Sequence, residues 1–148
     1  MPIIYVDADA CPVKQEISRV AERFGLTVYM VSNSGTYTAG RANVHSIMVS
    51  DGFDAADDWI AEKAAPNDIV ITNDIPLAAR ALEKGAHALA PNGRAFTKES
   101  IGTALAMREF NAYLRETGES KGHNASFSKQ DRSNFLQALD QLARKLCD

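Results

Sequence analysis

The sequence predicts an α/β protein of three layers, in which helices cover both faces of a mostly parallel central sheet. Short apolar runs, which are typical of buried parallel strands, alternate along the chain with stretches of helical periodicity. The 148 residues, 45% hydrophobic and 24% charged, fit one globular domain with a sizeable core. We expect a single domain, with an α/β core over residues 1–96, C-terminal helices over 97–148 and a polar linker near 116–128.

The first elements are a strand, a helix and two further strands. The apolar run Ile3 to Asp7 predicts the first strand, and Pro12 opens a helix because the first helical turn does not need its missing N–H group. An apolar stripe continues to Phe24, and Gly25 ends the helix. We expect the next strands over residues 26–31 and 44–49, with a polar, glycine-rich loop over 32–41 between them.

The middle of the chain repeats the alternation of helix and strand, and the end is helical. Thr97 can cap a helix to about residue 115, and Ser128 with Asp131 resembles a capping box for the last helix. The last helix carries an apolar face of Phe135, Leu139, Leu142 and Leu146. The preceding elements are expected as a helix over 54–65, a strand over 68–72, a helix over 75–84, a strand over 86–89 and a turn at 91–93.

Composition excludes several classes of protein. The net charge of −3 argues against a broadly basic surface that coats nucleic acid. Cys11 and Cys147 lie at opposite ends of the chain, so neither a disulfide framework nor a zinc knuckle is indicated. No signal peptide and no apolar stretch near the ~20 residues of a membrane span is evident, so we expect a cytoplasmic protein without a membrane partner.

Three groups of acids follow predicted strands or turns, and they are the most informative feature of the sequence. Asp7 and Asp9 follow the first strand, and Asp74 closes the run that ends in Thr72 and Asn73. Ligands of open parallel sheets bind at the carboxyl ends of the strands, and gathered carboxylates need a cation or protons between them. Oxygen ligands suit Mg²⁺ or Mn²⁺. The third group, in the stretch after Gly52, is Asp54, Asp57 and Asp58.

Each acid also has a simpler structural interpretation. Asp7 can cap a turn, and Asp9 can cap the helix that follows. Asp57 and Asp58 fall in the first turn of a helix, where they favour the helix dipole. Asp74 can be the N-cap of the next helix, a role that is compatible with binding a metal.

Other side chains are candidates for contacts with a substrate. Thr72 and Asn73 could place a hydroxyl or an amide on a phosphate or on metal-bound water. Lys14 and Arg41 could bind phosphate, and Arg41 shares its glycine-rich loop with Tyr37, which could stack on a base. Cys11 lies near a helix start but has no histidine nearby in the sequence, which favours a structural cysteine over a nucleophile.

At these residues the chain resembles the YaiI/YqxD family of small bacterial proteins over essentially its whole length. More distantly it resembles PIN-like nuclease domains, including the NYN group. The residues that carry the first resemblance are the runs Tyr5-Val6-Asp7-Ala8-Asp9-Ala10-Cys11-Pro12, Gly52-Phe53-Asp54-Ala55-Ala56-Asp57-Asp58 and Asp68-Ile69-Val70-Ile71-Thr72-Asn73-Asp74-Ile75-Pro76-Leu77-Ala78, with Asp131-Arg132.

The PIN-like resemblance implies a nuclease that uses Mg²⁺ or Mn²⁺ to activate water against a phosphodiester. It implies that Asp7 matches the first acidic position, Asp57 or Asp58 the middle one and Asp74 the later one. The metal ligands would then be Asp7, Asp57, Asp58 and Asp74, with Asp7, Asp9 and Asp74 as the catalytic acids. The chain departs from the pattern in its polar tail and in its Asp9-Ala10-Cys11-Pro12 elbow, and a fourth acid after the last short strand is not assigned.

Three functions remain open at the level of sequence. The first is metal-dependent hydrolysis of RNA, which makes RNA the expected partner. The second is a phosphatase of the haloacid dehalogenase type, with Asp7 as nucleophile and Asp9 as acid and base, although the expected second aspartate and lysine motif are missing. The third is a non-catalytic module that binds nucleic acid or a nucleotide. A homo-oligomer is compatible with the sequence but not indicated by it.

Overall fold

The computed structural model describes residues 2–33, 42–49, 55–103 and 127–147. Within these ranges, no helix is both long and apolar enough to cross a lipid bilayer. The elements are β1 (Ile3–Asp7), the 3-10 turn η1 (Ala8–Ala10), α1 (Lys14–Phe24), β2 (Thr27–Ser32), β3 (Val44–Met48), α2 (Ala55–Lys63), β4 (Ile69–Ile71), α3 (Ile75–Glu83), β5 (His87–Leu89), β6 (Ala95–Phe96), a helical stretch over 98–103 and α5 (Lys129–Cys147).

The strands form a six-stranded sheet in the order β3-β2-β1-β4-β5-β6. All neighbouring pairs are parallel except the last, in which β6 runs antiparallel to β5. Val6 of β1 lies opposite Met30 of β2 and Ile71 of β4, so these three strands end at the same edge of the sheet. The predicted α/β class with a mostly parallel sheet is therefore confirmed.

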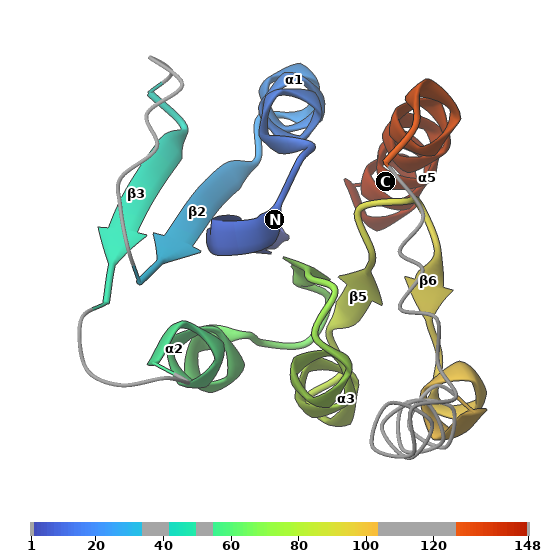
Figure 1. Ribbon diagram of the computed structural model, residues 1–148. Coiled ribbons are helices and arrows are strands. Elements are labelled where there is room, and N and C mark those ends of the chain that lie inside the picture. Colours follow the sequence, from blue (N-terminus) through green and yellow to red (C-terminus); the bar gives the residue numbers. More distant parts are fainter. Residues whose placement is uncertain (1, 34–41, 50–54, 104–126, 148) are drawn as a thin grey trace.

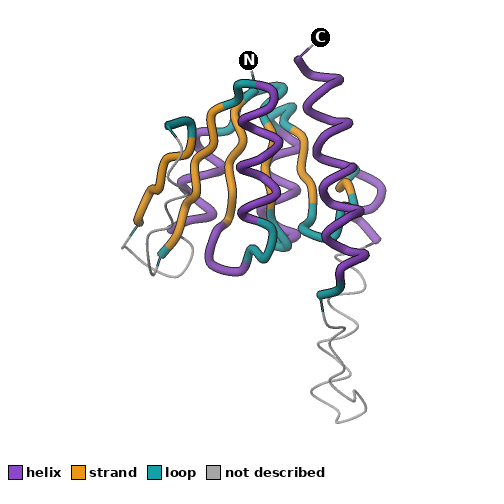
Figure 2. The backbone as a smooth tube through the Cα atoms, turned by 90° about the horizontal axis from the view of Figure 1, so that it is seen from above, coloured by secondary structure: helices purple, strands orange, loops and turns teal. Residues whose placement is uncertain are grey.

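Helices cover both faces of the sheet (Figure 1). α1 and α5 lie on one face, and α2 and α3 lie on the other, which Figure 2 shows from above. The side chains of β1 alternate between the two faces: Ile4 and Val6 belong to the core under α1 and α5, whereas Tyr5 belongs to the core under α2 and α3. Because β1 is covered on both faces, its sequence is a continuous apolar run rather than an alternating one.

Most element boundaries agree with the sequence predictions to within two residues. Gly25 ends α1 in the left-handed conformation with φ 69°, as a helix-terminating glycine does. Ser128 and Asp131 form the predicted capping box, because each accepts a hydrogen bond from the other's backbone N–H at 3.0 Å. Phe135 and Leu139 of α5 are buried, as expected.

Two features were not expected from the sequence: the strand β6 and the close approach of the turn before it to α5. β6 is a strand of two residues, too short to give a period, and it follows the predicted turn at residues 91–93. Gly93 of that turn has φ 93°, and a Cβ atom there would lie 2.7 Å from the backbone of Asn134. Glycine is thus required at this position both by the backbone conformation and by the close approach of α5.

Asp68 is a buried acid whose role is structural. It precedes β4, at the edge of the sheet opposite the carboxyl ends. Its Oδ1 accepts a hydrogen bond from the backbone N–H of Ile3 and its Oδ2 accepts one from Ala65, both at 3.0 Å. One carboxylate therefore joins the start of β1 to the turn between α2 and β4.

Replacing Asp68 by alanine should destabilise the fold, because two backbone N–H groups would lose a charged acceptor. We expect Asp68→Ala to lower the free energy of unfolding by about 2–4 kcal/mol, measured by urea unfolding. Asp68→Asn keeps one acceptor oxygen and should lose less. An alanine variant as stable as the wild type would show that water replaces both hydrogen bonds at no cost.

Candidate functional site

The carboxyl edge of the sheet brings Asp7 and Asp74 together through Thr72. Asp7 ends β1 and Thr72 follows β4, and the register of the two strands places these residues side by side on the face covered by α2 and α3. The buried Thr72 hydroxyl donates to Asp7 Oδ2 at 3.1 Å and accepts from the backbone N–H of Asp74 at 2.9 Å. A single hydroxyl thus links the two predicted acids.

Asp74 is also the N-cap of α3. Its Oδ1 accepts a hydrogen bond from the backbone N–H of Leu77 at 2.9 Å, and Pro76 stands in the first turn. The structural interpretation of Asp74 is therefore confirmed. Its use as a cap engages Oδ1, and Oδ2 takes part in none of the hydrogen bonds found among the described residues, so the site role remains open.

The environment of Asp7 disfavours its charge. Burial raises the pKa of the Asp7 carboxyl above its ordinary value, and the hydrogen bond from Thr72 opposes this shift in part. The nearby charges of Asp74 and Asp9 raise the pKa further. A half-buried carboxylate beside two other acids is the arrangement that a bound cation or a proton would relieve.

Asp9 ties the turn after β1 to the end of β2. It lies in η1, and its two oxygens accept hydrogen bonds from the Ser32 hydroxyl at 2.6 Å and from the backbone N–H of Asn33 at 2.8 Å. Ser32 was not among the predicted site residues, although it ends the neighbouring parallel strand β2 and therefore lies at the same edge. Asp9 thus fixes the course of the chain beside Asp7.

Asp58 forms an ion pair with Arg80 and does not join Asp7 and Asp74 at the carboxyl edge of the sheet. Asp57 and Asp58 lie in the first turn of α2, and Asp58 Oδ1 pairs with Arg80 Nη1 of α3 at 2.9 Å. Both partners are about half exposed, so this pair contributes little stability. Among the residues that the structure describes, no group of three or more His, Cys, Asp or Glu side chains could hold a metal ion, so the predicted set of four ligands is not assembled here.

Lys14 lies at the start of α1, beside the acidic edge. It lines a surface groove of about 480 Å³ together with Cys11, Pro12, Gln15, Glu16 and Arg132. Arg132 of α5 donates to the backbone carbonyl of Pro12 at 2.7 Å and lies over the ring of Phe127, 5.2 Å from its centroid. The C-terminal helix is thereby fixed to the turn that carries Asp9.

Cys11 has the properties of a structural cysteine. Burial raises the pKa of its thiol to about 11, despite smaller opposing effects of the Val13 backbone and of Lys14. A thiol with such a pKa is neutral at physiological pH and is not a nucleophile. Of the remaining candidates, Asn73 is exposed between Thr72 and Asp74, whereas Arg41, Tyr37 and Asp54 lie outside the described residues.

Comparison with known proteins places the chain in a family. The family model described as an uncharacterised YaiI/YqxD family matches residues 5–145. The chain belongs to the YaiI/YqxD family. It is 59% identical to a UPF0178 protein of Mesorhizobium japonicum, over 97% of this chain and 93% of that protein. It is 61% identical to one of Parvibaculum lavamentivorans, over 99% and 96% respectively. No solved structure matches the chain.

Thr72→Val should weaken this part of the YaiI/YqxD fold, because valine has the shape of threonine without its hydroxyl. The Asp7 carboxylate would lose a donor and the Asp74 N–H an acceptor, at a cost of about 1–3 kcal/mol in the free energy of unfolding. The pKa of Asp7 should rise further, which NMR titration of its carboxyl carbon can detect. Thr72→Ser keeps the hydroxyl and serves as the control. An unchanged Asp7 pKa in the valine variant would contradict the proposed link.

Asp7→Asn should stabilise the protein at pH 7 in the absence of metal, because it removes a charge that burial disfavours. We expect a rise in Tm of about 2–4 °C, measured by differential scanning calorimetry. The raised pKa means that folded Asp7 binds a proton more readily than unfolded Asp7, so the wild type regains stability as the pH falls. The difference in Tm between the variant and the wild type should disappear at about pH 3.5, which is below the pKa of Asp7 in the unfolded chain. An equal gain at pH 3.5 would contradict an electrostatic origin.

Proposed function

We propose that this protein is a divalent-metal-dependent phosphodiesterase that acts on RNA at the carboxyl edge of its sheet. The observation that carries the proposal is the link between Asp7 and Asp74 through the Thr72 hydroxyl. Two acids from separate strands are held at the place where open α/β sheets bind their ligands. The resemblance to PIN-like nucleases supports the reaction class and the choice of RNA.

The side chains at this edge fit an Mg²⁺ or Mn²⁺ ion for which the protein supplies only some of the ligands. Carboxylate oxygens are the ligands that both ions prefer. Mg²⁺ commonly uses one or two carboxylates and completes its shell with water and the phosphates of a substrate. Asp7 and Asp74 would supply those two carboxylates, and a metal bound here would lower the pKa of a water molecule and neutralise charge on phosphate. Because no group of three such ligands occurs among the described residues, water and substrate phosphate would have to complete the shell of the metal.

The remaining residues hold this arrangement in place. Thr72 fixes the Asp7 carboxylate and the start of α3, and Asp9 fixes the chain after β1 against the end of β2. We assign Thr72 and Asp9 as positioning residues and keep Asp7 and Asp74 for direct contact with metal and substrate. Asp57 stands in the first turn of α2 on the same face of the sheet and is a candidate to orient water.

The groove that Lys14 and Arg132 line is suited to the backbone of a single strand. Lys14 and Arg132 bring cations to this groove, in which Arg132 also pairs with Glu16 at 3.3 Å, and the exposed Phe127 beside Arg132 offers an aromatic face to a base. Proteins that bind single strands combine cations along the backbone with aromatic stacking platforms. A groove with two cations and one carboxylate beside the acidic edge is compatible with a net charge of −3.

The proposal predicts that Mn²⁺ binds the wild type and binds much more weakly after loss of either acid. We expect Asp7→Asn and Asp74→Asn to weaken Mn²⁺ binding about tenfold or more, measured by EPR of free Mn²⁺ with and without a single-stranded RNA oligomer. Asn at position 74 can still cap α3, so the Tm of this variant should stay near that of the wild type. Asp140→Asn removes an equal charge from α5 and is the matched control.

Cleavage of the same oligomer, labelled at one end, tests the activity itself. Asp74→Asn should slow cleavage at least about a hundredfold, whereas Asp140→Asn should not. A DNA oligomer of the same sequence tests the preference for RNA. Absence of Mn²⁺ binding both with and without RNA would overturn the metal site. RNA binding that persists in EDTA without cleavage would replace the nuclease by a non-catalytic binding module.

A further inference from the structure

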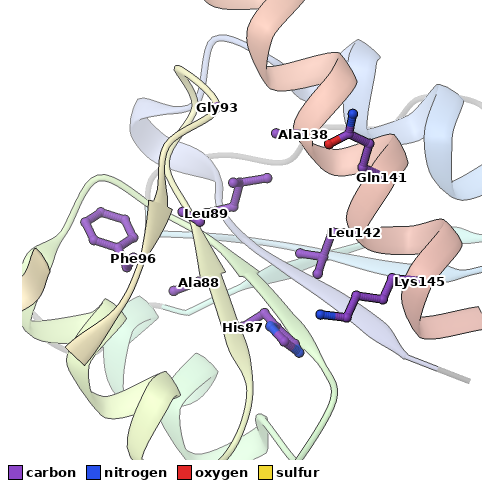
Figure 3. A pocket seen from close by; sticks show the side chains of 10 residues that line it. His87, Ala88, Leu89, Gly93, Phe96, Ala138, Gln141, Leu142 and Lys145 are labelled. Atoms are coloured by element: carbon purple, nitrogen blue, oxygen red, sulfur yellow. The ribbon is translucent and has the colours of Figure 1, made fainter. Parts of the chain in front are cut away.

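A second pocket lies between α5 and the β5–β6 hairpin, on the face of the sheet that α1 and α5 cover (Figure 3). Its volume is about 300 Å³, at the low end of the range for pockets that bind small molecules. It shares no lining residue with the groove that Lys14 and Arg132 line. The residues that line it are His87, Ala88, Leu89, Gly93, Ala95, Phe96, Ala138, Gln141, Leu142 and Lys145.

The periodicity of the elements explains which side chains face this pocket. Leu89 belongs to the core under α1 and α5, so His87, two residues earlier on β5, faces the same side. Ala95 pairs with Leu89 and shares that face. On α5, the pocket is lined by Ala138, Gln141, Leu142 and Lys145, at the spacing i, i+3, i+4 and i+7 that forms one helical stripe.

The packing of α5 accounts for the opening. Its buried stripe, which includes Phe135, Leu139 and Ala143, packs into the core, and the helix contacts α1. The neighbouring stripe is left to face the β5–β6 hairpin across the pocket. At one end the turn that contains Gly93 approaches the backbone of Asn134, so it closes the pocket in the direction of the start of α5.

The side chains of His87 and Lys145 lie at the other end of the pocket. Figure 3 shows the Lys145 side chain extending toward the imidazole of His87. Burial lowers the pKa of His87, and the positive charge of Lys145 lowers it further. The Lys145 ammonium supplies a positive charge and the His87 imidazole a ring nitrogen that can take up a proton when an anion binds, so this end of the pocket is a place where an anion would be stabilised.

Two carboxylates on elements next to these bases are engaged elsewhere. Asp68 accepts from the backbone of Ile3 and Ala65 on the other side of β4, and Asp140 of α5 pairs with Arg23 and Arg144. Within the described part of the chain, no carboxylate forms an ion pair with Lys145. The pocket lining itself contains no acid.

We propose that this pocket binds a small organic anion, with its carboxylate or phosphate between His87 and Lys145. The apolar part of the ligand would lie on Leu89, Ala95 and Leu142, and the Gln141 amide is available at the rim. The ligand class follows from the positive charge of Lys145 at one end of the pocket and from the apolar side chains that line the rest of it. A purely inorganic anion would leave that apolar surface in water.

This site is separate from the acidic edge. His87 pairs with Ile69, three residues before Thr72, which is about 10 Å along the strand. His87 and Thr72 also project to opposite faces of the sheet. The inference therefore does not depend on the proposed nuclease activity.

The test is an NMR titration of the ¹⁵N-labelled protein with hexanoate, with phenyl phosphate and with neutral hexanol. We expect saturable shifts of the amides of Ala88, Leu89 and Leu142 with at least one of the two anions, and a rise in the pKa of His87 when that anion is bound. Response to hexanoate alone would identify a carboxylate ligand, and response to phenyl phosphate alone would identify a phosphate ester.

Variants of Lys145 make the test specific, because this side chain is exposed and its replacement should not unfold the protein. Lys145→Met should weaken anion binding about tenfold or more, whereas Lys145→Arg should retain it. Lys129→Met, at the far end of the same helix, is the control for net charge. Hexanol binding as tightly as the anions, or no saturable shift with either anion at about 10 mM, would overturn the proposal.

Discussion

The parallel pairing of β1 with both β2 and β4 is the constraint on which the rest of the structure depends. It places a strand that is covered on both faces at the centre of the sheet and fixes where three strands end. Asp7 lies beside Thr72 only because Val6 lies opposite Ile71. A shift of β1 by one residue would turn Asp7 to the opposite face and remove the link to Asp74. The candidate site is therefore a consequence of strand register more than of any loop.

The acids of this chain show that a structural role and a chemical role can coexist at one edge. Asp74 caps α3 with one oxygen, and Asp9 joins the turn after β1 to β2 with both of its oxygens. Asp7 differs, because it accepts one hydrogen bond and lies where burial opposes its charge. The buried charge of Asp7 makes the folded protein less stable, and functional sites often lower the stability of a fold in this way. Asp68, which is buried deeper but bound by two backbone N–H groups, is the contrasting structural case.

The sequence predicted the α/β class and most strands and helices, because buried parallel strands and amphipathic helices have distinct periods. It missed β6, whose two residues carry no period. At the site, the rule that parallel strands end at one edge brought Asp7 and Asp74 together correctly. The same rule could not foresee the ion pair of Asp58 with Arg80, since that pair depends on the relative placement of α2 and α3. The pocket near His87 was also missed, because it depends on how α5 packs beside the β5–β6 hairpin.

The hydrogen bond from Ile3 to Asp68 has a consequence for how the chain folds during its synthesis. β1, which comes first among the described strands, is a central strand of the sheet, and the residue that anchors it is 65 residues further along the chain. β1, α1 and β2 can assemble early as one unit of two parallel strands and the helix between them, but one side of β1 must wait for β4. The α1 face stays incomplete for longer, because α5 follows all the other described elements along the chain. An apolar strand that is exposed for so long is a target for chaperones.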